Sequence, residues 1–83
     1  MSGQLFFESS VGLFSITPVL EGSAKVELGV GSTQIGTFLF PEAAMAAVYY
    51  HETGWRRWDR LHGKVRAPEL SDWTARPEHS PVT

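Results

Sequence analysis

The sequence predicts an α+β domain, in which a three- to four-stranded antiparallel β-meander packs against one main α-helix (about residues 41–53), followed by a short C-terminal helical segment. Two observations predict this class. Apolar and polar residues alternate through much of residues 5–39, which is typical of strands with one buried face. An alanine-rich stretch with helix start and stop signals then follows. Because the turns are short, we expect hairpins rather than crossover connections.

The strands are predicted from alternation with a period of two. In the second strand Phe14 and Ile16 share one face, and in the third strand Val26, Leu28 and Val30 do. Stretches rich in Gly and Ser separate the strands. The predicted strands cover residues 5–8, 13–20, 25–30 and 34–39, with turns at 9–12, 21–23 and 31–33. Residues 34–39 are open to a second interpretation, as an irregular lead into the helix.

The helix has recognisable ends. Pro41 suits the first helical position, because its φ is already helical and its missing N–H would have no partner there. Glu42 places a negative charge near the positive end of the helix dipole, and four alanines add high helix propensity. Gly54 can take the left-handed conformation that ends a helix. Phe40 occupies the N-cap position without a capping oxygen.

One side of the predicted helix is apolar, with the i, i+3, i+4 spacing of a buried face. An alanine-rich face lets the helix approach a sheet closely, so we expect this side to cover the strands. The positions on it are Ala43, Ala47 and Tyr50, flanked by Ala44, Val48 and His51.

The stretch after Gly54 combines aromatic and basic residues. Trp55, Trp58 and Leu61 follow i, i+3, i+6 spacing, which predicts a short helical segment that ends at Gly63. Residues 68–73 are expected to form one more helical turn. Because residues 74–83 contain almost nothing to bury, we expect one domain at 1–73 and a flexible tail at 74–83.

Composition excludes several classes of protein. The chain of 83 residues has no cysteine, which excludes disulfides and thiolate metal sites. Apolar runs fall short of the roughly 20 residues that span a membrane, and the first residues lack a basic region. We therefore expect a cytoplasmic protein without a membrane partner. The net charge of −2 conceals an asymmetry, because residues 54–66 hold five of the seven basic residues and one acidic residue.

Two adjacent stretches are similar to a known family. Residues 35–38 (Ile-Gly-Thr-Phe) and the helix opening at 41–49 (Pro-Glu-Ala-Ala-Met-Ala-Ala-Val-Tyr) resemble the plant AP2/ERF DNA-binding domain. The resemblance covers residues 35–49 and implies a three-stranded antiparallel sheet packed on one helix. Members of that family contact DNA through arginines and tryptophans of the exposed sheet face. Residues 4–39 contain one basic residue, Lys25, and no tryptophan, so no DNA-contact residue carries over.

No pattern in the sequence predicts catalysis. Serines are plentiful, but none lies in a nucleophile elbow, and the glycines at 29, 31 and 36 do not form a phosphate-binding loop. The three histidines, at 51, 62 and 79, lack the spacing of a metal site. His51 is instead interpreted as a histidine near a helix C-terminus, where its charged form is favoured. We expect no enzyme activity, no cofactor and no metal.

The candidate binding surface is the basic, aromatic stretch. Arginine and tryptophan are enriched at interface hot spots, and they also bind single-stranded nucleic acid through stacking and charge. Two alternatives stay open: Trp55 and Trp58 close the core, and the arginines pair with nearby acidic residues. The leading hypothesis is a small, non-enzymatic, bacterial-type protein–protein interaction module that can form a homodimer through a strand edge; the alternative is a nucleic-acid-binding module. The candidate residues are Trp55, Arg56, Arg57, Arg60, Lys64 and Arg66.

Overall fold

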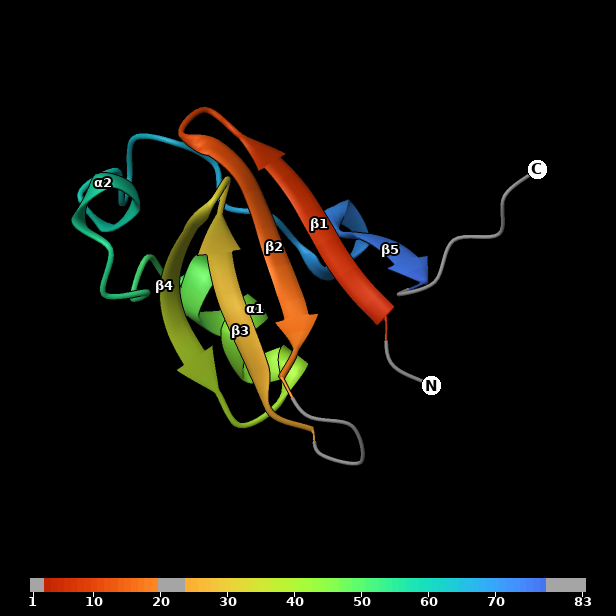
Figure 1. Ribbon diagram of the computed structural model, residues 1–83. Helices are drawn as coiled ribbons and strands as arrows, with labels where there is room; N and C mark the ends of the chain where they lie inside the picture. The colour runs from red at the N-terminus through yellow and green to blue at the C-terminus, as the bar shows by residue number, and fades with distance from the viewer. Residues whose placement is uncertain (1–2, 20–23, 78–83) are drawn as a thin grey trace.

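The computed structural model describes residues 3–19 and 24–77 and contains one five-stranded antiparallel sheet (Figure 1). The spatial order of the strands is β4-β3-β2-β1-β5. Their bounds are β1 Gly3–Ser9, β2 Gly12–Pro18, β3 Val26–Val30, β4 Thr33–Phe38 and β5 Thr74–Pro77. The helices are α1 Pro41–Tyr49 and α2 Arg56–Asp59, and a 3-10 turn covers Leu70–Asp72. The predicted α+β class and antiparallel meander are confirmed.

The buried face of the sheet is the one predicted from alternation. Phe14 pairs with Val30 and Ile16 with Leu28 across β2 and β3, and these four side chains belong to the hydrophobic core together with Val26. The register shifts between Leu28 and Gly29 where β3 meets β4. Such a bulge adds one unpaired residue to a strand. Residues 33–38 form β4, so the strand interpretation of residues 34–39 is confirmed.

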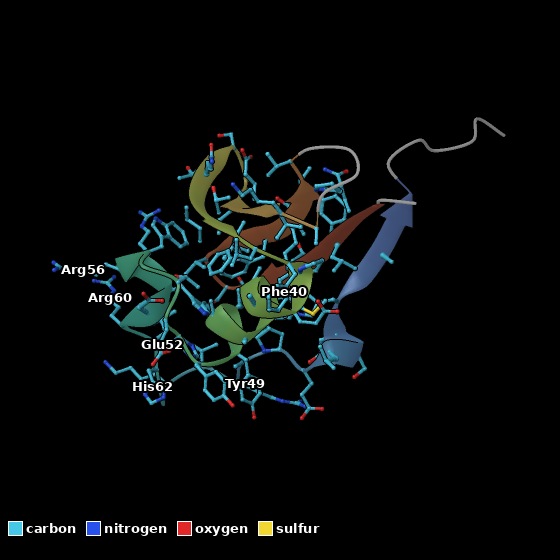
Figure 2. The ribbon with its side chains drawn as sticks, turned by 90° about the horizontal axis from the view of Figure 1, so that it is seen from below. Phe40, Tyr49, Glu52, Arg56, Arg60 and His62 are labelled. Atoms are coloured by element: carbon cyan, nitrogen blue, oxygen red, sulfur yellow. The ribbon has the colours of Figure 1, made fainter. Side chains whose placement is uncertain are left out.

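The helix layer covers this face. Ala44, Ala47 and Val48 of α1 are buried, and Figure 2 places α1 and α2 on the same side of the sheet. Trp58 of α2 is fully buried, and Trp73, just before β5, is nearly so. The two tryptophans extend an aromatic core: Phe14 meets Trp58 edge-on at 5.1 Å between ring centroids, and Trp73 at 6.5 Å. This core holds both segments that follow α1.

The end of α1 differs from the prediction. The helix ends at Tyr49, about four residues early, and His51 rather than Gly54 takes the left-handed conformation that ends it, with a φ of 57°. The N–H of Glu52 donates to the carbonyl of Ala47 at 2.8 Å, and that of His51 to Val48 at 3.2 Å. This is the Schellman arrangement, in which glycine usually occupies the left-handed position. The predicted position of Tyr50 on the sheet-facing side is wrong: Tyr50 is the C-cap residue, beyond the last helical turn, and its side chain is exposed.

The expected tail also needs correction. Residues 74–77 form β5, which pairs with β1 through Leu5 and Ala75 and through Phe6 and Thr74. The preceding Trp73 is only 8% exposed, so its burial brings this segment to the free edge of β1. The domain therefore extends beyond residue 73. The rest of the predicted tail, at 78–83, and the predicted strand end and turn at 20–23 lie outside the described residues.

Candidate functional site

The structure places the predicted site residues at one end of the helix layer. Arg56, Arg57, Arg60, Lys64 and Arg66 are all exposed, as charged side chains are expected to be. Trp55 is half-buried and packs against the core. In Figure 2 the side chains of Arg56 and Arg60 extend from α2 away from the body of the molecule. The basic part of the predicted surface is therefore accessible, and its tryptophan contributes mainly to packing.

A carboxylate fixes the position of α2. Asp59 accepts hydrogen bonds from the backbone N–H of Thr53 at 3.0 Å, from its hydroxyl at 2.8 Å and from the N–H of Gly54 at 2.8 Å. The hydroxyl oxygen of Thr53 in turn accepts a hydrogen bond from the N–H of Trp55 at 3.1 Å. Gly54 has a φ of 86°, a conformation that few other residues adopt. The one-turn helix α2 is thus attached to the end of α1.

The arginines of α2 form no ion pair with side chains in the part of the chain that the structure describes. Among the described residues there is one ion pair, between Arg66 and Glu69 at 3.9 Å, with side chains 82% and 63% exposed. Both carboxylate oxygens of Asp59 are engaged with the turn at 53–54. The sequence left open that the arginines pair with acidic neighbours. Among the described residues this applies to Arg66 only.

Trp58 belongs to the core. Its side chain has no exposed surface, and its indole N–H donates to the carbonyl oxygen of Val48 at 2.9 Å. This hydrogen bond joins α2 to the last turn of α1 and satisfies the only polar atom of the indole. A ring buried in this way is not available for stacking on a base, which leaves Trp55 as the one partly exposed tryptophan of the stretch.

His51 lies between two other rings. It stacks on Trp58 with ring centroids 4.4 Å apart and planes at 13°, and His62 meets it edge-on at 5.5 Å. His51 is 7% exposed, and neither ring nitrogen has a hydrogen-bond partner among the described residues. Burial lowers the pKa of His51, as does the charge of His62, whereas Asp59 acts in the opposite direction. The interpretation that its charged form is favoured is therefore wrong, because removal of the ring from water, the largest cause of the shift, favours the neutral form.

A surface that the sequence did not predict lies on the outward side of α1. It is a hollow of about 300 Å³ between α1 and residues 68–73, and a second hollow of about 420 Å³ adjoins it towards residue 62. We name these two hollows the aromatic groove. Tyr49, Tyr50 and Glu69 line both hollows. The first is completed by Met45, Ala46, Pro68, Leu70 and Trp73, and the second by His51, His62, Gly63, Val65, Arg66 and Ala67.

Large apolar side chains are exposed along the aromatic groove. Tyr49 is 46% exposed, Tyr50 58% and Leu70 70%, and the two tyrosine rings meet edge-on at 5.0 Å. A signal for Tyr49 was present in the sequence, because it follows Glu42 and Met45 at helical spacing on the side opposite the buried alanines. Nothing local indicated Leu70, which reaches the groove only through the chain path after α2.

The described residues lack two kinds of feature. They contain no group of three or more side chains suited to hold a metal ion. In the same part of the chain no helix has the length and apolar character to cross a bilayer.

Comparison of the chain with protein-family models, with curated proteins and with solved structures finds no significant match. The similarity of residues 35–49 to the AP2/ERF domain therefore stays a prediction.

Proposed function

We propose that this protein is a small, non-enzymatic protein–protein interaction module whose binding surface is the aromatic groove. The observation that carries the proposal is the exposure of Tyr49, Tyr50 and Leu70 around one hollow. Exposed apolar patches with polar rims mark interaction sites, and tyrosine, methionine and arginine are enriched at interfaces. The hollow of about 300 Å³ is at the lower limit for a small-molecule pocket, which favours a partner's side chain. The lack of cysteine is compatible with the cytoplasmic setting that we propose.

A displayed library of random dodecapeptides tests the proposal without a known partner. Peptides are selected on the wild-type protein and then titrated against Leu70→Ser and Leu13→Ser. Leu13 is the matched control, since it is an exposed leucine, at 44%. It precedes buried Phe14 in β2, and because neighbouring residues of a strand point to opposite faces, it lies on the other face of the sheet. We expect peptides that lose affinity for Leu70→Ser only. An empty selection, or equal loss with both variants, contradicts the proposal.

Self-association through β4 is the homodimeric form of the proposed module. The sequence of β4, Thr33–Phe38, has no charged residue and no proline, the devices that commonly protect an edge strand from pairing. The register shift at Leu28 and Gly29 lies in the pairing of β4 with β3, on the inner side of the strand. Sedimentation equilibrium is expected to give roughly twice the monomer mass of 9.2 kDa. A monomer at the highest soluble concentration contradicts this form and leaves a different protein as the partner.

Nucleic-acid binding is the second candidate function. Arg56, Arg57 and the C-cap residue Arg60 have no ion-pair partner among the described residues. They favour this function, because accessible cations release counterions from phosphates. The burial of Trp58 counts against it, since stacking supplies much of the affinity for single strands. Fluorescence titration with labelled oligonucleotides at low salt is expected to give affinity that falls steeply with salt, with a flatter slope for Arg57→Ala. A lack of binding at low salt eliminates this candidate.

A further inference from the structure

We infer that the partner held by the aromatic groove is an acidic protein segment with one large apolar side chain as its anchor. The inference rests on the proposed function, because it names the chemistry of the partner at that same surface. It follows from the unlike character of the two ends of the groove, one apolar and one cationic.

The apolar end accepts the anchor. Met45, Tyr50 and Leu70 line the first hollow, and nearly buried Trp73 lines it too. Met45 is unbranched and adaptable, so it can adjust to the shape of a side chain that enters. A leucine or an aromatic residue in this hollow removes apolar surface of both molecules from water, which is the main source of interface affinity.

The cationic end selects the charge of the partner. Arg66 and His62 line the second hollow, and Lys64 lies between Gly63 and Val65, which also line it. The ion pair of Arg66 with Glu69 is long, at 3.9 Å, and exposed, so a partner's carboxylate can replace it at little cost. Exposed Arg56 and Arg60 of the same stretch extend outward on the side of the molecule where His62 lies, as Figure 2 shows. Complementary charge favours an acidic partner and suppresses a basic one.

Two acidic side chains determine how the partner lies. Glu69 lines both hollows, and exposed Glu52 directly follows His51, which lines the second hollow. A continuous phosphate backbone would pass close to these carboxylates and be repelled. A peptide can instead place its apolar anchor near Leu70 and its carboxylates beside Arg66. This distribution favours a protein partner over a nucleic acid.

The peptides selected on the wild-type protein also test this inference. We expect the selected peptides to combine a net negative charge with a leucine or aromatic residue. In fluorescence anisotropy titrations, Arg66→Glu should weaken binding by about tenfold, the effect of losing one charge-assisted contact. Lys25→Glu is the matched control, because it changes the net charge of the protein by the same amount as Arg66→Glu. Lys25 directly precedes β3 and does not line the groove. Its affinity should stay within about twofold of the wild-type value.

The outcomes separate the inference from the proposed function. Selected peptides that depend on Leu70 but are neutral or basic overturn the inference and leave the interaction module standing. Equal effects of Arg66→Glu and Lys25→Glu also overturn the inference, because only net charge then matters. A selection that yields no peptide dependent on Leu70 overturns both. Binding of oligonucleotides in place of peptides, with sensitivity to Arg57→Ala, overturns both in favour of the nucleic-acid candidate. Thermal unfolding followed by circular dichroism verifies that each variant is folded.

Discussion

Replacement of Trp58 by phenylalanine tests whether this residue joins α2 to the rest of the domain. The side chain has no exposed surface and packs edge-on against Phe14. Its indole N–H donates to the carbonyl of Val48 at 2.9 Å, and its ring stacks on His51. Phenylalanine keeps an aromatic ring but removes the donor and part of the buried carbon framework. The variant therefore separates the hydrogen bond and the fit of the indole from general hydrophobicity.

The expected loss in the free energy of unfolding is about 2–3 kcal/mol. The hydrogen bond contributes roughly 1 kcal/mol, and the two ring carbons that are lost contribute roughly 1–2 kcal/mol in burial and packing. A domain of 83 residues has a total stability of roughly 4–12 kcal/mol. In a domain of this size each kcal/mol lowers Tm by about 4–8 °C, so Tm should fall by about 10–20 °C.

Urea unfolding followed by far-UV circular dichroism measures this loss, because the signal does not depend on which tryptophan remains. Trp55→Phe is the matched control: Trp55 is half-buried, and no hydrogen bond from its ring is recorded in the described part of the chain. That control should lose less than about 1 kcal/mol, as partly exposed sites do. If Trp58→Phe loses no more stability than Trp55→Phe, the assignment of Trp58 as the joining residue is wrong.

Three further predictions concern the turns and His51. Burial holds the pKa of His51 below its ordinary value of 6.5, so the unfolded chain gains the proton first as pH falls. The free energy of unfolding should therefore keep its full value above about pH 6.5. Below that pH it should decrease by at most about 1.4 kcal/mol per pH unit. Urea unfolding at several pH values checks this, and His51→Asn should flatten the dependence; an equal slope in both proteins contradicts it. Asp59→Ala removes three hydrogen bonds to the turn after α1 and should cost about 2–3 kcal/mol in urea unfolding, whereas exposed Glu52→Ala should change stability by less than about 0.5 kcal/mol; equal losses would be evidence against a structural role for Asp59. Gly12→Ala should cost about 2–3 kcal/mol by thermal unfolding, because Gly12 has a φ of 133° and a Cβ there would lie 2.8 Å from a valine methyl group of β3. Gly31→Ala, at a φ of 59° with open space around it, should cost only about 1 kcal/mol, and the reverse order would contradict the steric reason.

The sequence predicted the strands and the start of the helix because both depend on local patterns. Alternation placed Phe14, Ile16 and Leu28 on one face, and that face is buried. Pro41 marks the first residue of α1, with Phe40 as an N-cap without a side-chain hydrogen bond. Such features follow from the backbone geometry of a few neighbouring residues, so they can be read before the chain folds.

The end of α1 and the last strand could not be predicted in this way. His51 takes the left-handed conformation. Its ring stacks on that of Trp58, seven residues further on. Residues 74–77 have no strand signal of their own, and they form β5 only because Trp73 is buried and the edge of β1 is free to pair. In both places packing between distant segments outweighed local propensity.

The candidate site divides in the same manner. The sequence by itself determined that Arg56, Arg57 and Arg60 would lie on the surface, because a charged side chain is costly to bury wherever the chain goes. Only the tertiary structure decided that these arginines lack ion-pair partners within the described residues, and that Tyr50 and Leu70 meet around one hollow. Tyr50 and Leu70 are twenty positions apart in the sequence. The path of the chain after α2 brings them together, and Trp58 and Trp73 fix that path by their burial in the core.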